Sequence, residues 1–270
     1  MNADACEYPL FDTHAHLNFP PFSENIPATI KKFQAKNIQK VFIPATKASE
    51  FVELLFLAHH YEKIFYVGLG LHPYFIPSHL PSDIDYLSLL IQKDKASVQP
   101  VIKAIGEIGL DAAIAKIDSD LFKQQCNLFR SQLILAKEFN LPVVIHSRKT
   151  HSLILTYLKK TVPGLRGVIH GFSGSYEEAM NFIKLGFMIG VGSVITYSRA
   201  NKTRRAIAKI PLEWVVLETD SPDMPPSGQQ GTVNRSENLV QIFSVLCALR
   251  QESRSHIAKV IWGNSQQLTC

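Results

Sequence analysis

The chain has 270 residues, 46% of them hydrophobic and 19% charged, with a formal net charge of +5 and a sequence pI near 8.9. This composition excludes a disordered chain, and the charge suits a polyanionic substrate but lacks the dense Lys/Arg footprint of a dedicated nucleic-acid binder. We find no signal peptide and no run of 18 apolar residues, and we therefore expect one cytoplasmic domain over residues 1–270, with no membrane contact and no obligate protein partner. Four scattered cysteines are expected to be free thiols: Cys6, Cys126, Cys247 and Cys270.

Short apolar runs alternate along the chain with stretches of helical periodicity. We predict strands at 10–16, 41–45, 64–70, 101–108, 141–146, 167–172, 187–192 and 214–220. We predict helices at 27–35, 49–60, 84–92, 119–139, 150–160, 176–185, 202–208, 235–250 and 255–267. The strands are nearly continuous in Val, Ile, Leu and Phe, as parallel strands covered by helices are. The fold expected is an α/β (β/α)8 TIM barrel, and an open doubly wound sheet is the alternative, although no G-x-G-x-x-G turn follows the first strand.

Six potential metal ligands stand where predicted strands end. They are His14, His16, Glu107, His146, His170 and Asp220. The carboxyl ends of parallel strands meet at one mouth of a barrel, where active sites of this fold are found. The pattern predicts a metal-dependent hydrolase.

The first strand ends in H-x-H, and residues two apart in a strand share a face, so His14 and His16 can point at one ion. Glu107 lies in an apolar strand, where a carboxylate needs a cation or a hydrogen-bond partner, and it could bridge two cations. The alternatives are chance histidines and a buried Glu bonded to backbone or to a His. Asp220 could bind a metal and accept the proton of the attacking water. Glu218 could orient a ligand from behind or form a helix-supporting salt bridge.

Arg148 follows His146 directly and could clamp a phosphate in a bidentate manner, or could serve its loop. The other histidines, His59, His60, His79, His151 and His256, are given no role. Lys202, Arg204 and Arg205 form a basic cluster that we interpret as a solvated helix face more than as a contact for nucleic acid.

Six motifs in order resemble the TatD family of metal-dependent deoxyribonucleases: DTHAHL (12–17), GLHP (70–73), GEIGLD (106–111), VIHSR (144–148), HGFSG (170–174) and LETDSP (217–222). The segment ETDSPDMP with QGTVNRSEN (230–238) looks most like its branch of uncharacterised hydrolases called YjjV. The resemblance implies a TIM barrel of the amidohydrolase type, in which a Glu replaces the carboxylated Lys of other members.

The resemblance also implies ligand sets and substrate contacts. His14, His16, Glu107 and Asp220 would hold one divalent ion, and Glu107, His146 and His170 a second. His72 would contact the substrate phosphate, its alternative being a loop cap before Pro73. Asn234 would correspond to a substrate-binding Asn, although NRSE stands here where members often read RNEP.

Together these observations predict a hydrolase that cleaves DNA or another phosphodiester by metal-activated hydroxide, with Asp220 and Glu107 as catalytic residues. The two ions would be Zn, Mg or Mn. One alternative is an amidohydrolase-like enzyme for a small cyclic amide, lactone or ester, because the same metals would generate the same nucleophile. Another is a binding scaffold without chemistry, against which the intact ligand set argues.

Overall fold

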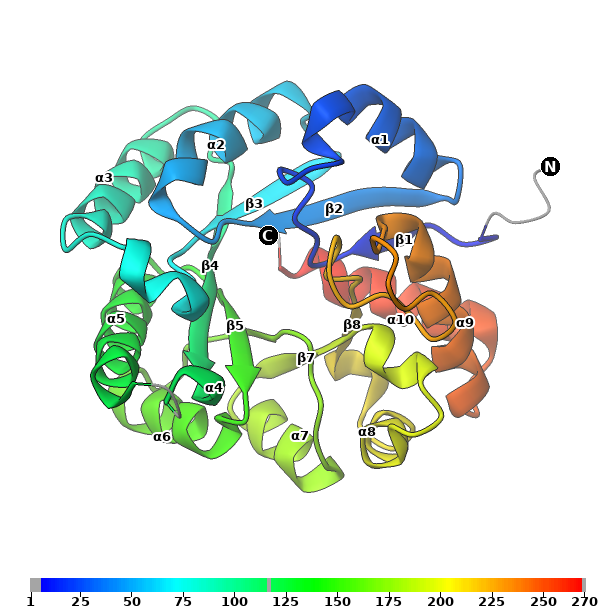
Figure 1. The fold of residues 1–270 in the computed structure, drawn as a ribbon. Coiled ribbons are helices and arrows are strands. Elements are labelled where there is room, and N and C mark those ends of the chain that lie inside the picture. Colours follow the sequence, from blue (N-terminus) through cyan, green and yellow to red (C-terminus); the bar gives the residue numbers. More distant parts are fainter. Residues whose placement is uncertain (1–5, 116–117, 269–270) are drawn as a thin grey trace.

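The computed structural model describes residues 6–115 and 118–268 and shows eight parallel strands paired in chain order, each with the next. The strands form a ring that the helices surround (Figure 1). The strands are β1 Leu10–Asp12, β2 Ile38–Pro44, β3 Phe65–Leu69, β4 Ile102–Asp111, β5 Val143–Arg148, β6 Gly167–Ile169, β7 Phe187–Val191 and β8 Val215–Leu217. The predicted (β/α)8 barrel is confirmed.

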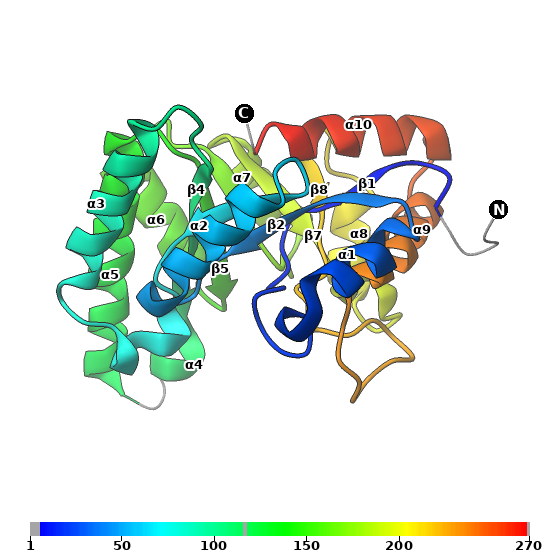
Figure 2. The same ribbon diagram turned by 90° about the horizontal axis from the view of Figure 1, so that it is seen from above.

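Helices follow the strands around the outside of the ring. The α-helices are α1 Ile26–Gln34, α2 Phe51–His60, α3 Asp83–Lys95, α4 Ala112–Ala115, α5 Ser119–Glu138, α6 His151–Thr161, α7 Tyr176–Ile183, α8 Asn201–Ile207, α9 Leu239–Leu249 and α10 Arg254–Gln266. Short 3-10 helices are η1 Ser23–Asn25, η2 Ala48–Glu50, η3 Pro73–Ser78, η4 Ser193–Thr196, η5 Leu212–Trp214 and η6 Ser236–Asn238. Figure 2 shows α10 along the side of the molecule opposite to the one toward which β5 points.

The predicted elements match the observed ones to within a few residues at most ends. The first, sixth and eighth strands are shorter than predicted. In the first strand, regular pairing with β2 ends at Asp12. The short α4 and the 3-10 helices η1, η3, η4 and η5 were not predicted. All of them lie in connections between the strands and the longer helices.

Side chains of the strands alternate between two cores. Val41 and Ile43 of β2 belong to the large core between strands and helices, whereas Phe42 between them packs with Phe11, Ala104 and Val144. This alternation follows from the two-residue period of a strand and places the second group inside the ring. The interior is therefore filled with side chains, and the barrel is no pore.

The ring closes where the chain just after β1 meets the chain just after β8. The His16 amide donates to the Ser221 carbonyl at 2.7 Å, and the Asp220 amide donates to the His14 carbonyl at 2.8 Å. Ala15 and Ser221 form a parallel bridge between the same segments. Closure of the barrel therefore brings three of the predicted ligands together by their own backbone.

Asp12 secures the same seam with its side chain. Its carboxylate is completely buried and accepts hydrogen bonds from the Thr219 amide at 2.9 Å and the Thr219 hydroxyl at 2.6 Å. Burial raises the pKa of Asp12 to about 7, and the bonds from Thr219 oppose that rise. Asp12 thus fixes the position of the strand ends from which the ligands project.

Within the described residues no helix is long and apolar enough to cross a membrane. Cys6, Cys126 and Cys247 are free thiols, as expected. Cys270 lies outside the described residues.

Candidate metal centre and adjoining pocket

Glu107 lies at the centre of a ring of imidazoles at the carboxyl end of the barrel. Its carboxylate, carried by β4, is 3% exposed. Five histidine nitrogens lie within 3.5 Å of its two oxygens: His14 and His16 at Oε2, and His72, His146 and His170 at Oε1. These nitrogens compensate the buried negative charge, and each oxygen of the carboxylate has its own set of nitrogen neighbours.

The first set has the dimensions of a cation site. The Nε2 atoms of His14 and His16 are 3.3 Å apart, and they lie 3.0 and 3.4 Å from Glu107 Oε2. Asp220 Oδ1 lies 3.6 Å from His14 Nε2 and 3.8 Å from His16 Nε2. Four ligands at about 2.1 Å from a tetrahedral ion are about 3.4 Å from one another. These four side chains therefore fit one divalent cation.

The second set surrounds the other oxygen of Glu107. Oε1 lies 3.0 Å from His72 Nε2, 3.2 Å from His146 Nδ1 and 3.5 Å from His170 Nε2. The remaining nitrogen of His146, Nε2, is buried without a hydrogen-bond partner in the described structure and lies 3.6 Å from Asp111 Oδ2. His146, His170 and the shared carboxylate of Glu107 offer ligands for a second cation.

Hydrogen bonds behind the imidazoles fix which nitrogen faces the centre. His16 Nδ1 lies 3.2 Å from the Pro44 carbonyl, and His170 Nδ1 lies 3.1 Å from Glu218 Oε1. Because a carbonyl or carboxylate oxygen only accepts, both Nδ1 atoms carry the proton. Nε2 of His16 and of His170 therefore faces the centre and becomes a metal ligand when its proton leaves, because metal binding displaces protons from its ligands.

His72 has the opposite polarity. Its Nδ1 accepts a hydrogen bond from the Tyr74 amide at 3.1 Å, so in the neutral ring the proton is on Nε2, which donates to Glu107 Oε1 at 3.0 Å. Although His72, Glu107 and His146 lie close enough to share an ion, this tautomer leaves His72 no lone pair for one. We therefore count His72 as a donor at the edge of the centre.

Charge is unevenly distributed over the site. Burial opposes ionisation of Glu107, but the surrounding His72, His14 and His170 hold the pKa of Glu107 well below its ordinary value. Burial lowers the pKa of His14 to about 4. Against burial, the charges of Glu218, Asp220 and Glu107 raise the pKa of His170 to about 10. An anionic core with imidazoles around it attracts cations.

Asp220 is the most accessible of the carboxylates in the centre. Its side chain is 21% exposed, against 3% for Glu107 and 1% for Glu218. Its backbone is in the left-handed region, with φ +62°. The hydrogen bond from the Asp220 amide to the His14 carbonyl stabilises this conformation. Burial raises the pKa of Asp220 to about 6, with the charge of His170 opposing and that of Glu107 adding to the rise.

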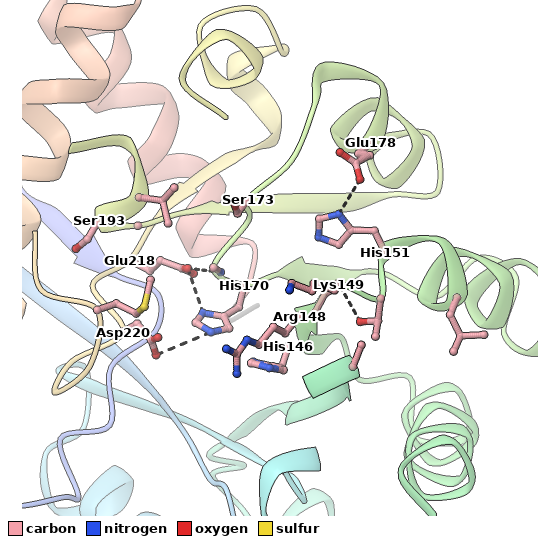
Figure 3. A pocket seen from close by; sticks show the side chains of 18 of the residues that line it. His146, Arg148, Lys149, His151, His170, Ser173, Glu178, Ser193, Glu218 and Asp220 are labelled. Atoms are coloured by element: carbon pink, nitrogen blue, oxygen red, sulfur yellow. Dashed lines mark hydrogen bonds and ion pairs between the residues drawn. The ribbon is translucent and has the colours of Figure 1, made fainter. Parts of the chain in front are cut away.

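A pocket of about 860 Å³ opens beside the centre, on the side of β5 to β8. His146, His170, Glu218 and Asp220 line one part of it (Figure 3). Its volume lies within the usual range for small-molecule sites. The centre and the pocket together form one candidate active site.

The structure brings the six predicted ligands together. Of the predicted substrate-binding residues, Arg148 lies on the pocket wall, whereas Asn234 is buried. Arg148 lines the pocket, is 60% exposed, and lies 3.6 Å from Asp111. Asn234 is completely buried, and its amide donates to the carbonyls of Thr219 at 2.7 Å and Met224 at 3.1 Å. Asn234 therefore holds the loop after β8 from within.

Glu218 lies behind His170, which decides between its two predicted roles. Its Oε1 accepts from His170 Nδ1 and from the Gly171 amide, the latter at 2.5 Å. It is no helix salt bridge. A carboxylate in this position orients a metal-ligating imidazole.

Four residues that were not among the predicted site residues also line the pocket. His151, Glu178, Lys202 and Ser193 line it. Lys202 pairs with Glu178 at 3.1 Å, so this member of the basic cluster faces the pocket. Arg204 instead donates to the Ile195 carbonyl. A signal existed for His151, because it begins the helix after a ligand-bearing strand, on the catalytic side of such a barrel.

Comparisons with known proteins show the family to which the chain belongs. Residues 11–269 match the family described as TatD related DNase. The chain is 46% identical over 261 residues to an uncharacterised metal-dependent hydrolase of Haemophilus influenzae, covering 96% of this chain and 98% of the relative. The crystal structure of YjjV, a TatD homologue from Escherichia coli, is 42% identical, with a TM-score of 0.89 and coverage of 96% and 97%. A relative from Erwinia tasmaniensis named 3'-5' ssDNA/RNA exonuclease TatD is 29% identical, with coverage of 96% and 99%.

Proposed function

We propose that this chain, which belongs to the TatD related DNase family and is a metal-dependent hydrolase, hydrolyses phosphodiester bonds in DNA. The proposed ligands of a first cation are His14, His16, Glu107 and Asp220. The proposed ligands of a second are Glu107, His146 and His170. The metals would be Zn, Mg or Mn, which such nitrogen and carboxylate ligands accept.

The observation that carries the proposal is the carboxylate of Glu107 between two sets of imidazole nitrogens. Its two oxygens face different histidines, so a single side chain can serve two adjacent cations. Two-metal sites of this kind act on phosphodiesters by stabilising both the attacking and the leaving oxygen. An anionic substrate makes such a pair of charges useful, because charge on the phosphoryl oxygens increases toward the transition state.

When bound, divalent cations would polarise a phosphoryl oxygen and acidify water. The residues of the chain supply the rest of the chemistry. Asp220, whose pKa is raised to about 6 and whose side chain reaches the pocket, would take the proton of the attacking water. His72 Nε2–H points at Glu107 and would donate to a phosphoryl oxygen beside it.

Basic side chains on the pocket wall support a nucleic-acid substrate. Arg148 and Lys149 from the end of β5 and Lys202 from α8 line the pocket, next to the ligands His146 and His170. Guanidinium and ammonium groups on the wall of such a pocket would attract the phosphates that flank the scissile one. The name of the Erwinia tasmaniensis relative, an exonuclease for single-stranded DNA and RNA, supports the same substrate class.

The proposal is tested by assaying the metal-reconstituted protein on single-stranded DNA, duplex DNA, RNA and bis(4-nitrophenyl) phosphate, a small phosphodiester. Glu107→Ala is the negative control, and metal content is measured for both proteins. We expect divalent-dependent cleavage of DNA that is lost, together with bound metal, in the variant. Turnover of a small amide or lactone without any phosphodiester cleavage would overturn the proposal.

A further inference from the structure

His151 is held rigidly at the edge of the pocket. It begins α6, five residues after the ligand His146, and its side chain is 10% exposed. Its ring stacks on Phe172 at 5.3 Å and 7°, and meets Phe182 edge to face at 5.5 Å and 85°. Its Nδ1 lies 3.4 Å from Glu178 Oε1. These contacts leave one ring edge free to face the pocket.

Glu178 determines which ring nitrogen of His151 carries the proton. Its Oε2 accepts hydrogen bonds from the Ser175 amide at 2.7 Å and from Lys202 Nζ at 3.1 Å. Against the effect of burial, these bonds lower the pKa of Glu178 to about 2, so it is an anion and only accepts. Because Nδ1 of His151 faces this carboxylate, Nδ1 carries the ring proton.

The other nitrogen, Nε2, then has a free lone pair. Burial lowers the pKa of His151, which keeps the ring neutral at neutral pH despite the Glu178 charge. In Figure 3 the ring nitrogen that does not bond Glu178 turns toward the middle of the pocket. Among the described residues none hydrogen-bonds Nε2. The pocket wall therefore offers a fixed hydrogen-bond acceptor.

A hydrogen-bond acceptor in this position favours binding of a sugar hydroxyl of a nucleic acid over binding of its phosphodiester. A phosphodiester carries only acceptor oxygens, so it has no hydrogen to donate to the Nε2 lone pair. Sugar hydroxyls donate, and they are the donors that do not vary with base identity. Ser193 adds an independent sign of a polar ligand, because it lines the same pocket and its buried hydroxyl has no partner among the described residues.

We propose that His151 determines specificity by accepting, through Nε2, a hydrogen bond from a sugar hydroxyl of the nucleotide next to the scissile phosphate. The inference rests on the proposed phosphodiesterase function. The hydroxyl is either the terminal 3'-hydroxyl of a chain or the 2'-hydroxyl of RNA. The same acceptor chemistry serves both, and experiment separates them.

Two variants isolate Nε2. In His151→Asn the amide nitrogen takes the place of Nδ1 and can still donate to Glu178, whereas His151→Phe keeps the stack on Phe172. What both variants lack is the Nε2 acceptor. Metal content and melting temperature are measured for each and are expected to match the wild-type protein.

Each protein is assayed for kcat/KM on a single-stranded DNA with a 3'-hydroxyl, the same DNA ending in a 2',3'-dideoxynucleotide, and RNA of the same sequence. If the 3'-hydroxyl is the donor, the dideoxy end costs the wild type roughly tenfold, as loss of one hydrogen bond does, and costs both variants nothing. If the 2'-hydroxyl is the donor, a preference of similar size for RNA is lost in both variants. Equal losses on all three substrates, or none, would overturn the proposal.

A binding measurement gives a second readout. Calorimetric titration with thymidine 5'-monophosphate and with its 3'-deoxy analogue is expected to show weaker binding of the analogue by wild type alone, if the 3'-hydroxyl is read. Adenosine and deoxyadenosine 5'-monophosphates make the matching pair for the 2'-hydroxyl. Bis(4-nitrophenyl) phosphate, which has no sugar, separates the two proposals. All three proteins should cleave it equally. If the wild type cleaves neither this compound nor any of the nucleic acids, the phosphodiesterase function itself is overturned, and the inference with it.

Discussion

Replacement of Glu218 by Gln tests whether the charge of Glu218 strengthens metal binding through His170. Glu218 is 1% exposed, and its Oε1 accepts from His170 Nδ1 at 3.1 Å. Gln has the same shape and keeps an oxygen acceptor, but the negative charge that makes His170 a stronger ligand is removed. Loss of such a partner lowers metal affinity about 10- to 100-fold, or about 1.4 to 2.7 kcal/mol.

The assay is calorimetric titration of Zn²⁺ or Mn²⁺ into the metal-free protein at fixed pH. Glu213→Gln, at an exposed position on η5, changes the net charge equally and is the matched control. Gly190→Ala should reproduce the loss sterically, because an added Cβ would lie 2.4 Å from Glu218 Oε2. If Glu218→Gln binds metal within twofold of the wild type and of the control, the reasoning is refuted.

Three further outcomes are expected. Gly109→Ala should destabilise the protein by about 3 kcal/mol or more and lower metal content, because φ is +147° there and the new Cβ would lie 2.0 Å from the His146 carbonyl; denaturant unfolding measures it, and a loss under 1 kcal/mol would contradict the packing described. Glu252→Gln should cost stability only in part of the pH range. Hydrogen bonds from Arg250, with burial opposing, lower the pKa of Glu252 to about 2, so its contribution is complete above its ordinary pKa and disappears as pH falls toward 2; unfolding curves of both proteins should therefore converge in acid, and a constant difference from pH 7 to 2 would show that the ion pair is not the cause. Removal of metal with a chelator should lower the melting temperature and re-addition should restore it, because a cation that binds only the folded state stabilises it; an unchanged melting temperature would mean that the centre binds none.

The sequence predicts the barrel well because its two periodicities are local. Strands of the interior are runs of Val, Ile and Leu, and helices repeat every 3.6 residues, so neither depends on distant contacts. The ligands were predictable for a related reason: a His or a Glu at the end of an apolar strand is costly without a partner. Glu107, almost fully buried among imidazoles, is the clearest example.

What the sequence could not predict depends on tertiary geometry. The tautomer of His72 is fixed by the Tyr74 amide in η3, a turn that has no periodic pattern. The direction of His151 depends on Phe172 and on α7, which follow it in the chain. Around Asn234 the sequence reads NRSE where family members often read RNEP. The buried hydrogen bond of its amide to the Thr219 carbonyl shows that Asn234 supports the loop after β8. Residue type alone carries none of this information.

The closure of the barrel between its first and last strands also determines when, during synthesis, the ligand set can form. Asp12 and Thr219, which clamp the two ends together, are 207 residues apart in sequence. A chain made from the N-terminus displays His14 and His16 long before Asp220 exists, and domains of this kind fold as units. The complete ligand set therefore forms only after nearly the whole barrel has been synthesised, and a cation must enter a finished fold instead of guiding a nascent one.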